Sequence, residues 1–216
     1  MMQIELQTPE EVQTGSRSRL YELLSQGFRY PTLSLYESAK RGQFLEEVRA
    51  ALETFRYGLG PPGEFAKGTP LSFDEFELEY VQAFDVGGPR GAPCFLYEAE
   101  YGGGRLKVME DVLSFYHYFG LRLSQEKGKR DRPDHLATEL EFLHALTFKE
   151  AEVLTEKKEV TSYRKAQRDF LNSHLVDILS DVAAKVGPRE IPFYSDLARL
   201  GHAFCQAELA HLSATV

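Results

Sequence analysis

Two Glu-x-x-His pairs stand out in the sequence, because this spacing is used in helical proteins to hold metal ions. The pairs are Glu141 with His144 and Glu208 with His211. In di-iron carboxylate bundles, two such pairs and a glutamate from each of two further helices point inward and bind the metal ions. These residues indicate one candidate chemistry, that of a di-iron oxidase inside a helical bundle.

A helical wheel treats the two pairs differently. At about 100° per residue, Glu208 and His211 fall on the apolar stripe of the last predicted helix. Glu141 and His144 fall outside the apolar stripe of their own helix. One pair is therefore predicted to face the interior and the other to face solvent, which leaves the di-iron site as an alternative hypothesis.

A third polar group opens a predicted helix. His135 and Glu139 lie four residues apart near the apolar edge of that helix, directly after Asp134. An aspartate at this place can accept the free amides of the first turn and is favoured by the helix dipole, so Asp134 is predicted to cap the helix. The histidine beside it can exchange hydrogen bonds with a bound peptide. The residues alone leave capping and peptide binding open.

The remaining motifs with possible chemistry are weaker. The glycines of 102–104 precede Arg105 and Lys107 and could hold an anion at a helix start, but they lack the ending of a phosphate-binding P-loop. A nucleotide-responsive protein stays a further alternative to a plain flexible helix entry. The sequence has no G-x-S-x-G motif, and neither Cys94 nor Cys205 has an activating neighbour in the sequence.

Helices must position these residues, and the sequence predicts where the helices lie. Capping boxes at Thr8–Glu11 and Ser72–Glu75 mark two helix starts. Apolar residues then recur with helical spacing in seven segments, namely 8–28, 45–55, 73–84, 106–116, 136–143, 171–186 and 197–204.

These segments predict an all-α fold. We expect a single bundle-like helical domain over residues 1–216, with about seven or eight helices. Within it, a short helical N-terminal part (about 1–57) is followed by a Gly/Pro-rich hinge at 58–63. Exchange of helices across this hinge is conceivable, so we expect either a monomer or a domain-swapped dimer.

Composition excludes several classes of partner. The 216 residues include 25 Lys and Arg against 33 Asp and Glu, a net charge of −8, which disfavours binding to nucleic acid. No apolar run approaches the roughly 18–20 residues of a membrane-spanning helix. Two cysteines form at most one disulfide and fit no metal-binding spacing, which favours a reducing compartment. We therefore expect a cytoplasmic protein that does not insert into membranes.

Five short motifs follow one another along the chain. In chain order they lie at 80–85 (YVQAFD), 97–101 (YEAEY), 116–120 (YHYFG), 133–136 (PDHL) and 139–143 (ELEFL). The most specific part is Pro-Asp-His-Leu at a helix start, downstream of a Tyr-Glu-x-x-Tyr segment. This ordered set resembles the TorD/DmsD/NarJ family of redox-enzyme maturation chaperones, also called the nitrate reductase delta subunit family, over about residues 10–185.

The resemblance implies an all-helical cytoplasmic chaperone that catalyses no reaction and carries no cofactor of its own. Such a chaperone binds the apo catalytic subunit of a molybdopterin enzyme of the dimethyl sulfoxide reductase family, often through its N-terminal twin-arginine leader peptide. It holds the subunit until the molybdopterin guanine dinucleotide is inserted. The segments at 94–96 (CFL) and 142–143 (FL) resemble the branch that serves type II enzymes acting on nitrate, selenate, perchlorate, dimethyl sulfide or ethylbenzene.

The resemblance also implies which residues contact the client protein. Ala99 stands where the family usually has a serine, so a hydroxyl contact is not expected there. The client-binding residues carried over by the motifs are Tyr97, Glu98, Tyr101, Asp134 and His135, with Tyr80 and Phe84 shaping the apolar wall.

A basic and apolar leader peptide requires a receptor with an acidic rim beside a hydrophobic groove. We therefore predict that tyrosines line a groove and that carboxylates flank it, although a run of charges can also be only a solvated face. For this arrangement, the stretch around Tyr97 and the stretch opening with Asp134 must meet on one accessible concave surface. The candidate rim residues are Asp74, Glu75, Glu77, Glu79, Glu98, Glu100, Asp131 and Asp134.

Overall fold

The computed structural model describes residues 5–60, 62–63, 65, 71–85, 94–123, 132–188 and 191–216. The secondary structure in these ranges is helical, apart from one isolated antiparallel β-bridge between Tyr97 and His135. The prediction of an all-α fold is therefore confirmed. The α-helices are α1 (Pro9–Phe28), α2 (Leu33–Arg41), α3 (Gln43–Leu52), α4 (Phe73–Tyr80), α5 (Arg105–Tyr118), α6 (Leu136–Thr155), α7 (Thr161–Phe170), α8 (Val176–Val186) and α9 (Pro192–Thr215).

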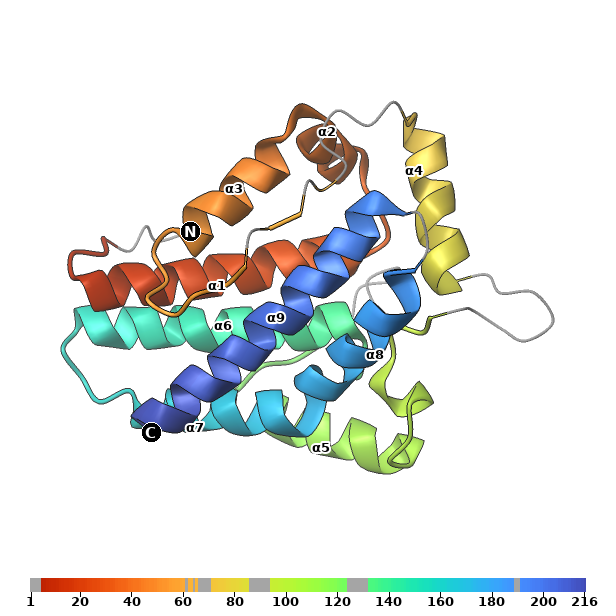
Figure 1. The fold of residues 1–216 in the computed structure, drawn as a ribbon. Coiled ribbons are helices and arrows are strands. Elements are labelled where there is room, and N and C mark those ends of the chain that lie inside the picture. The colour runs from red at the N-terminus through yellow and green to blue at the C-terminus, as the bar shows by residue number, and fades with distance from the viewer. Residues whose placement is uncertain are drawn as a thin grey trace.

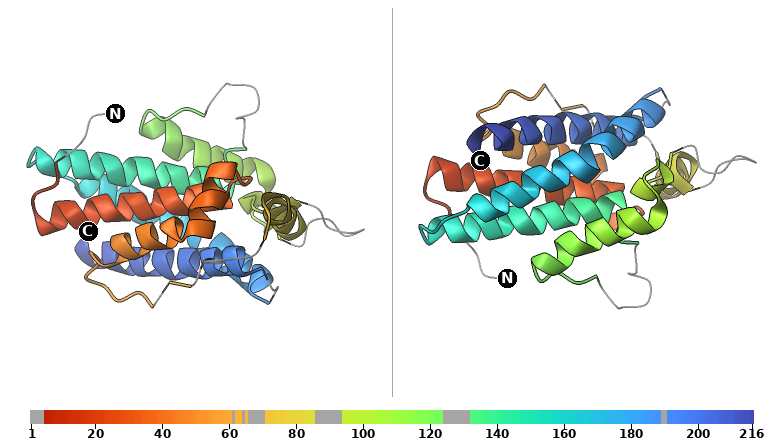
Figure 2. Two further views of the ribbon diagram at one scale, coloured as in Figure 1. Left: turned by 90° about the horizontal axis from the view of Figure 1, so that it is seen from above. Right: turned by 90° about the horizontal axis from the view of Figure 1, so that it is seen from below.

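Helices α1 and α6 form the antiparallel pair at the centre of the fold (Figures 1 and 2). The Ser25 hydroxyl, late in α1, donates to the Ala137 carbonyl at the start of α6 over 2.8 Å. Ser18, two turns earlier in α1, lies 2.9 Å from His144 Nδ1, further along α6. The predicted capping box at the start of α1 is present, with the Thr8 side chain accepting from the Glu11 amide.

Helix α9 runs across this pair, beside α8 (Figure 1). A Cβ atom added to Gly27 of α1 would lie 2.7 Å from a methyl group of Leu197, so the close approach of α1 and α9 requires a glycine. Further along the same contact, the rings of Tyr21 and Phe204 lie 4.7 Å apart. These contacts belong to a hydrophobic core that extends from residues of α1 to residues of α9.

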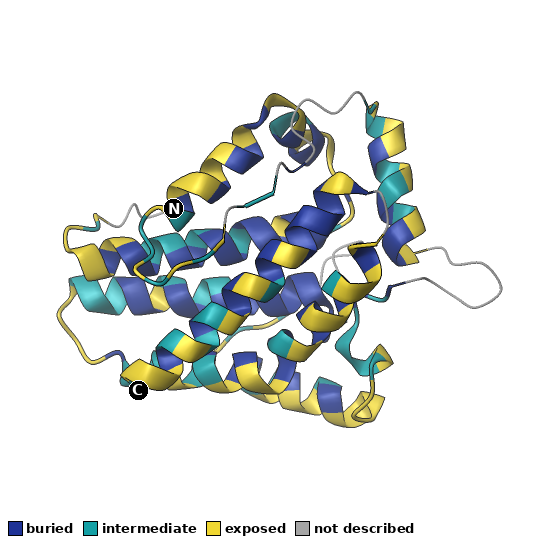
Figure 3. Ribbon diagram, in the orientation of Figure 1, coloured by how far each residue is buried: buried dark blue, intermediate teal, exposed yellow. Residues whose placement is uncertain are grey.

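Helix α5 is attached to the bundle mainly through aromatic rings. Tyr116 packs on Phe142 of α6 at a centroid distance of 4.8 Å, and Phe115 packs on Phe170 of α7 at 5.1 Å. The outer surface of α5 is exposed along most of its length (Figure 3), including Tyr118, which is 81% exposed. Only a narrow face of α5 is therefore fixed to the core.

Two helices were not predicted as separate elements. Helix α2 buries only Leu35, Tyr36 and Ala39, and α7 buries only Gln167 and Phe170, so neither presents a wide apolar stripe. Helix α7 continues through a π-helical turn, η3 (Leu171–Leu175), into α8. The prediction therefore detected the apolar second half of this stretch and missed its polar first half.

A buried ionic cluster joins α1, α6, α7 and α9. The Arg17 guanidinium, 2% exposed, donates to Glu208 at 2.7 Å, to Glu150 at 3.2 Å and to Gln167 at 2.7 Å. Burial raises the pKa of Glu150, but the charges of Arg17 and Arg164 outweigh this and hold it below its ordinary value. Each ion here is paired and hydrogen-bonded, which is the condition for burying charge. The prediction that Glu208 faces the interior is confirmed.

Candidate functional site

The two stretches expected to form the site lie side by side. Tyr97 and His135 form the antiparallel β-bridge. On either side of it, the Leu136 amide donates to the Leu96 carbonyl over 2.8 Å, and the Glu98 amide donates to the Asp134 carbonyl over 2.9 Å. The predicted meeting of these stretches is confirmed, and it is made by backbone hydrogen bonds rather than by side chains.

Asp134 lies inside the protein rather than on its surface. Its carboxylate is 0% exposed and forms a two-pronged ion pair with Arg132, with N–O distances of 2.9 and 2.6 Å. It also accepts from the Ala99 amide at 3.2 Å. The prediction that Asp134 caps the helix is wrong. The N-cap of α6 is His135, whose Nδ1 atom accepts from the Ala137 amide at 3.2 Å.

Tyr97 is held between two partners. The Arg132 guanidinium lies over its ring at 4.3 Å, and the His135 ring meets it edge-on at a centroid distance of 5.0 Å. Arg132 also reaches Glu100, at 3.0 Å. One arginine thus connects the buried Asp134 to the Tyr97 ring, so the orientation of this ring depends on the ion pair between Arg132 and Asp134. We call the side of the site that is formed by Tyr97 and His135 the Tyr97 wall.

Glu98 and Tyr101 point away from this wall. Glu98 accepts from His174 Nδ1, at 2.9 and 3.1 Å from its two oxygens. The Tyr101 hydroxyl donates to the Phe95 carbonyl over 2.7 Å, and burial raises the pKa of this phenol above its ordinary value. Both side chains therefore hold the turn at 98–100 to the body of the protein.

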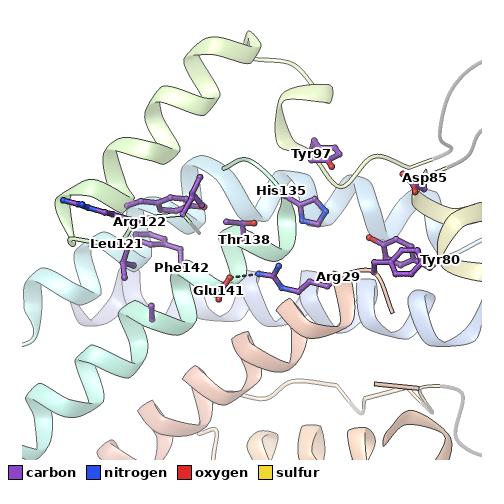
Figure 4. A pocket seen from close by; sticks show the side chains of 14 residues that line it. Arg29, Tyr80, Asp85, Tyr97, Leu121, Arg122, His135, Thr138, Glu141 and Phe142 are labelled. Atoms are coloured by element: carbon purple, nitrogen blue, oxygen red, sulfur yellow. Dashed lines mark hydrogen bonds and ion pairs between the residues drawn. The ribbon is translucent and has the colours of Figure 1, made fainter. Parts of the chain in front are cut away.

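A pocket of about 760 Å³ opens beside Tyr97 and His135. Figure 4 shows Tyr80 and Asp85 at one end, Leu121 and Arg122 at the other, and the Arg29–Glu141 ion pair between them. The lining residues come from the end of α4 and from η1 (Val81–Asp85), from the residues that follow α1, from α5 and the residues that follow it, from Tyr97, and from one face of α6. They are Arg29, Tyr30, Tyr80, Asp85, Tyr97, Tyr116, Leu121, Arg122, Leu123, His135, Thr138, Glu141, Phe142 and Ala145.

Of the client-binding residues expected from the sequence, three line this pocket, namely Tyr80, Tyr97 and His135. Phe84 does not line it, because its ring, 6% exposed, packs on Tyr80 at 5.1 Å and on Tyr194 at 5.3 Å. Glu98, Tyr101 and Asp134 lie behind the wall, as described above.

The charges at the pocket differ from the predicted acidic rim. The carboxylates that line it are Asp85 and Glu141, and two arginines, Arg29 and Arg122, line it as well. None of the candidate rim residues is among the lining residues, and Asp131 falls outside the described part of the chain. The described pocket is therefore aromatic, with charges of both signs.

Most of the additional lining residues carry no motif of their own. The set on α6 could have been found from helical spacing, since residues 135, 138, 142 and 145 share one helix face. The Thr138 hydroxyl on this face is buried and has no hydrogen-bond partner among the described residues. Its usual acceptor, the carbonyl four residues earlier, is that of Asp134, which already accepts from Glu98.

The residues of the di-iron alternative do not converge. Glu141 pairs with Arg29, and His144 lies 2.9 Å from the Ser18 hydroxyl. Glu208 is tied to Arg17. Across the described ranges, no group of three or more His, Cys, Asp or Glu side chains could hold a metal ion.

The glycines of the nucleotide-binding alternative form a turn. Gly102, Gly103 and Gly104 all have positive φ, at 131°, 82° and 82°, and Gly104 is the N-cap of α5. No side-chain hydrogen bond caps this helix start. The run of glycines is therefore explained by a backbone that L-residues rarely adopt.

Comparisons with known proteins point to one family. A family model described as nitrate reductase delta subunit matches residues 41–179. The chain is 32% identical to the perchlorate reductase assembly chaperone protein of Dechloromonas aromatica, over 91% of this chain and 90% of the relative. It is 34% identical to the selenate reductase assembly chaperone protein of Thauera selenatis, over 66% and 72% of the two chains.

A further relative and a solved structure agree with this. The dimethyl sulfide dehydrogenase assembly chaperone protein of Rhodovulum sulfidophilum is 30% identical, over 91% of this chain and 81% of the relative. A crystal structure of a candidate redox enzyme maturation protein from Archaeoglobus fulgidus matches with a TM-score of 0.52 and 19% identity, over 95% of this chain and 97% of that one. This structural match supports the fold.

Proposed function

We propose, from the premise that this chain belongs to the nitrate reductase delta subunit family, that it is an assembly chaperone for a molybdoenzyme. The observation that carries the proposal is the similarity, over nearly the whole chain, to proteins named as assembly chaperones for perchlorate reductase and dimethyl sulfide dehydrogenase. The client is the catalytic subunit of a molybdenum enzyme similar to perchlorate reductase and dimethyl sulfide dehydrogenase, and the chaperone binds it before its cofactor is inserted. The chaperone itself catalyses no reaction and works in the cytoplasm.

The pocket beside Tyr97 and His135 is the proposed client-binding surface. Its aromatic lining offers apolar area to a client segment, and its volume of about 760 Å³ exceeds that of a few side chains. Tyr80, Tyr97 and His135 contact the client. Asp134 and Glu98 act indirectly, because they hold the Tyr97 wall in place from behind.

A leader peptide with a basic start and an apolar middle is the proposed occupant of the pocket. Tyr30, 51% exposed, and Tyr80 lie edge-to-face at 5.4 Å, and Asp85 lines the same end of the pocket. A carboxylate next to aromatic rings attracts guanidinium groups through charge and through the ring faces. The apolar middle of the leader would then lie over Phe142 and Leu121.

None of the helices in the described ranges is long and apolar enough to cross a membrane. The proposed chaperone acts by binding the client and later releasing it. Deletion of the gene in its host tests this proposal directly. One molybdoenzyme should lose activity while its catalytic subunit accumulates without molybdenum, measured by metal analysis of the isolated subunit.

Complementation makes the test specific to the pocket. The wild-type gene should restore molybdenum loading, and a Tyr97→Ala variant should restore it poorly. Tyr118→Ala is the matched control, because Tyr118 is 81% exposed on the outer face of α5 and does not line the pocket. Full molybdenum content in all molybdoenzymes of the deletion strain would refute the chaperone function.

A further inference from the structure

Beneath the Tyr97 wall lies a carboxyl group that the proposed client contacts do not use. Glu139, on α6 one turn after His135, is 0% exposed. Neither of its carboxyl oxygens accepts a hydrogen bond from an N–H or O–H donor among the described residues. An ionised carboxylate in such a place would be very unfavourable, so the carboxyl group must either be neutral or be stabilised by a neighbouring group.

The neighbour is a second carboxyl group, that of Glu98. Burial, followed by the charge and hydrogen bonding of Glu98 and the charge of Asp134, raises the pKa of Glu139 well above its ordinary value. Two carboxyl groups can lie side by side when one of them carries the proton and donates it to the other. Glu139 therefore holds the proton and Glu98 accepts it.

Glu98 is fixed on its other side by an imidazole. His174 Nδ1 lies 2.9 and 3.1 Å from the two Glu98 oxygens, and the His174 ring is 5% exposed. It projects from the π-helical turn η3, which interrupts the helical stretch from α7 to α8. Such turns often occur where a helix presents a residue with a special role.

We propose that Glu139, Glu98 and His174 form a proton-sharing group that positions the Tyr97 wall of the pocket. Glu98 directly follows Tyr97, so a Glu98 side chain held from both sides fixes the turn from which Tyr97 reaches the pocket. Glu139 and His174 do not line the pocket, and they act on it only through Glu98. The consequence for client binding rests on the function proposed above, whereas the positioning itself does not.

The other charged and titratable groups around Glu139 favour this state. Asp134, just before α6, forms an ion pair with Arg132. Tyr116, on α5, donates its hydroxyl to the Pro133 carbonyl, and burial followed by the charge of Glu139 raises its pKa well above the ordinary value. None of these groups supplies a positive charge directly to Glu139, so loss of its proton would place it beside uncompensated negative charge.

Removal of the proton should therefore release the wall. With both carboxyl groups ionised, repulsion would drive Glu98 outward, because it is the less buried partner, at 15% exposed. The backbone bonds from the Glu98 amide to Asp134 and from the Leu136 amide to Leu96 would then open. Between the ordinary pKa of Glu139, 4.5, and its raised pKa in the closed wall, linkage of one proton to this opening predicts a decrease in protection of about tenfold per pH unit.

Three variants test the proposal on the isolated protein. Glu139→Gln keeps the shape and a donor for Glu98 but cannot ionise, so it should hold the wall at every pH. Glu139→Leu removes the donor and should expose the wall even at neutral pH. Glu79→Gln is the matched control, because burial also raises the pKa of Glu79, which lies on α4 outside the pocket.

Amide hydrogen exchange of Glu98 and Leu136, followed by NMR and corrected for intrinsic rates, gives the first readout. Protection should fall with rising pH in the wild type and in Glu79→Gln, and it should stay constant in Glu139→Gln. Infrared spectroscopy gives the second, since the carbonyl stretch of a protonated carboxylic acid should weaken in Glu139→Gln. Identical pH profiles for the wild type and Glu139→Gln, or an unchanged acid band, would overturn the proposal.

Binding of the client subunit identified by gene deletion separates this proposal from the proposed function. Glu139→Gln should retain affinity at the pH values at which the wild type loses it. If the wall opens as expected and client affinity does not change, the proton-sharing group stands and the pocket is not the client-binding surface.

Discussion

Replacement of His135 by asparagine and by alanine separates two roles that this residue combines. Its Nδ1 atom caps α6 by accepting from the Ala137 amide at 3.2 Å, and its ring packs on Tyr97 at 5.0 Å and lines the pocket. Asparagine is among the best N-cap residues and alanine among the poorest. His135→Asn therefore removes the ring and keeps the cap, whereas His135→Ala removes both.

The size of each effect follows from these contacts. Loss of the edge-to-face ring contact costs about 0.5–1.5 kcal/mol, and loss of an N-cap costs about 1 kcal/mol. The alanine variant should therefore be less stable than the asparagine variant by about 1 kcal/mol, or about 2–4 °C in melting temperature for a chain of this size. Circular dichroism during thermal unfolding measures this difference.

Client binding should respond differently from stability. Both variants lack the imidazole that faces the pocket, so both should bind the client subunit more weakly, and to a similar degree. Isothermal titration calorimetry with the client subunit provides the measurement. Wild-type affinity of His135→Asn would refute a direct contact, and equal melting temperatures for the two variants would refute the capping role.

Three further perturbations test the fold around the site. Arg17→Met leaves the buried Glu208 without its arginine and Glu150 with Arg164 alone, and it should destabilise the protein by about 3–5 kcal/mol in urea unfolding; a loss below about 1 kcal/mol would contradict the ionic cluster. Gly27→Ala places a Cβ 2.7 Å from Leu197 and should cost about 1–3 kcal/mol, whereas Gly58→Ala, with no atom within 4 Å, should be neutral; equal melting temperatures would exclude the close approach of α1 and α9. The pKa of Glu139 is raised in the folded protein, so its contribution to stability is full below pH 4.5, its ordinary pKa, and is lost as pH rises through the folded value. The stability advantage of Glu139→Gln over the wild type should therefore grow above pH 4.5 in urea titrations at several pH values. A constant advantage would contradict burial of the proton.

Local signals in the sequence predicted the helices that have them. The capping boxes at Thr8 and Ser72 start α1 and α4 where expected, because a cap depends on residues within one turn. Helix α7 was missed because its stability comes from packing by Gln167 and Phe170 rather than from a continuous apolar stripe. Helical periodicity detects burial along a face, and a mostly polar helix offers little of it.

The position of Asp134 shows the limit of local reasoning at the site. An aspartate before a helix has nearby amides to accept from, and the presence of Arg132 two residues earlier does not by itself show that the carboxylate turns away from them. The competing donors are the Ala99 amide, from a distant segment, and the Arg132 guanidinium, and together they take the carboxylate away from the helix start. The capping role then passes to His135, which is a less common N-cap residue.

The charges of the pocket depend on tertiary structure in the same way. The acidic residues of α4 were natural candidates for a rim because they are clustered in sequence, but the carboxylates that line the pocket come from η1 and α6. Arg29 and Tyr30 reach it because α1 ends just before Pro31. Neither residue belongs to a motif shared with the family, so only the assembled helices could reveal them.

The arrangement of the site explains how adjacent residues can serve one surface by different means. His135 faces the pocket, while Asp134, its neighbour, fixes Arg132 and through it the ring of Tyr97. Glu98 holds the wall in place from its other side, through its hydrogen bond with His174. Because the wall rests on buried polar groups rather than on the apolar core, small changes in charge beneath it can move Tyr97 without unfolding the bundle.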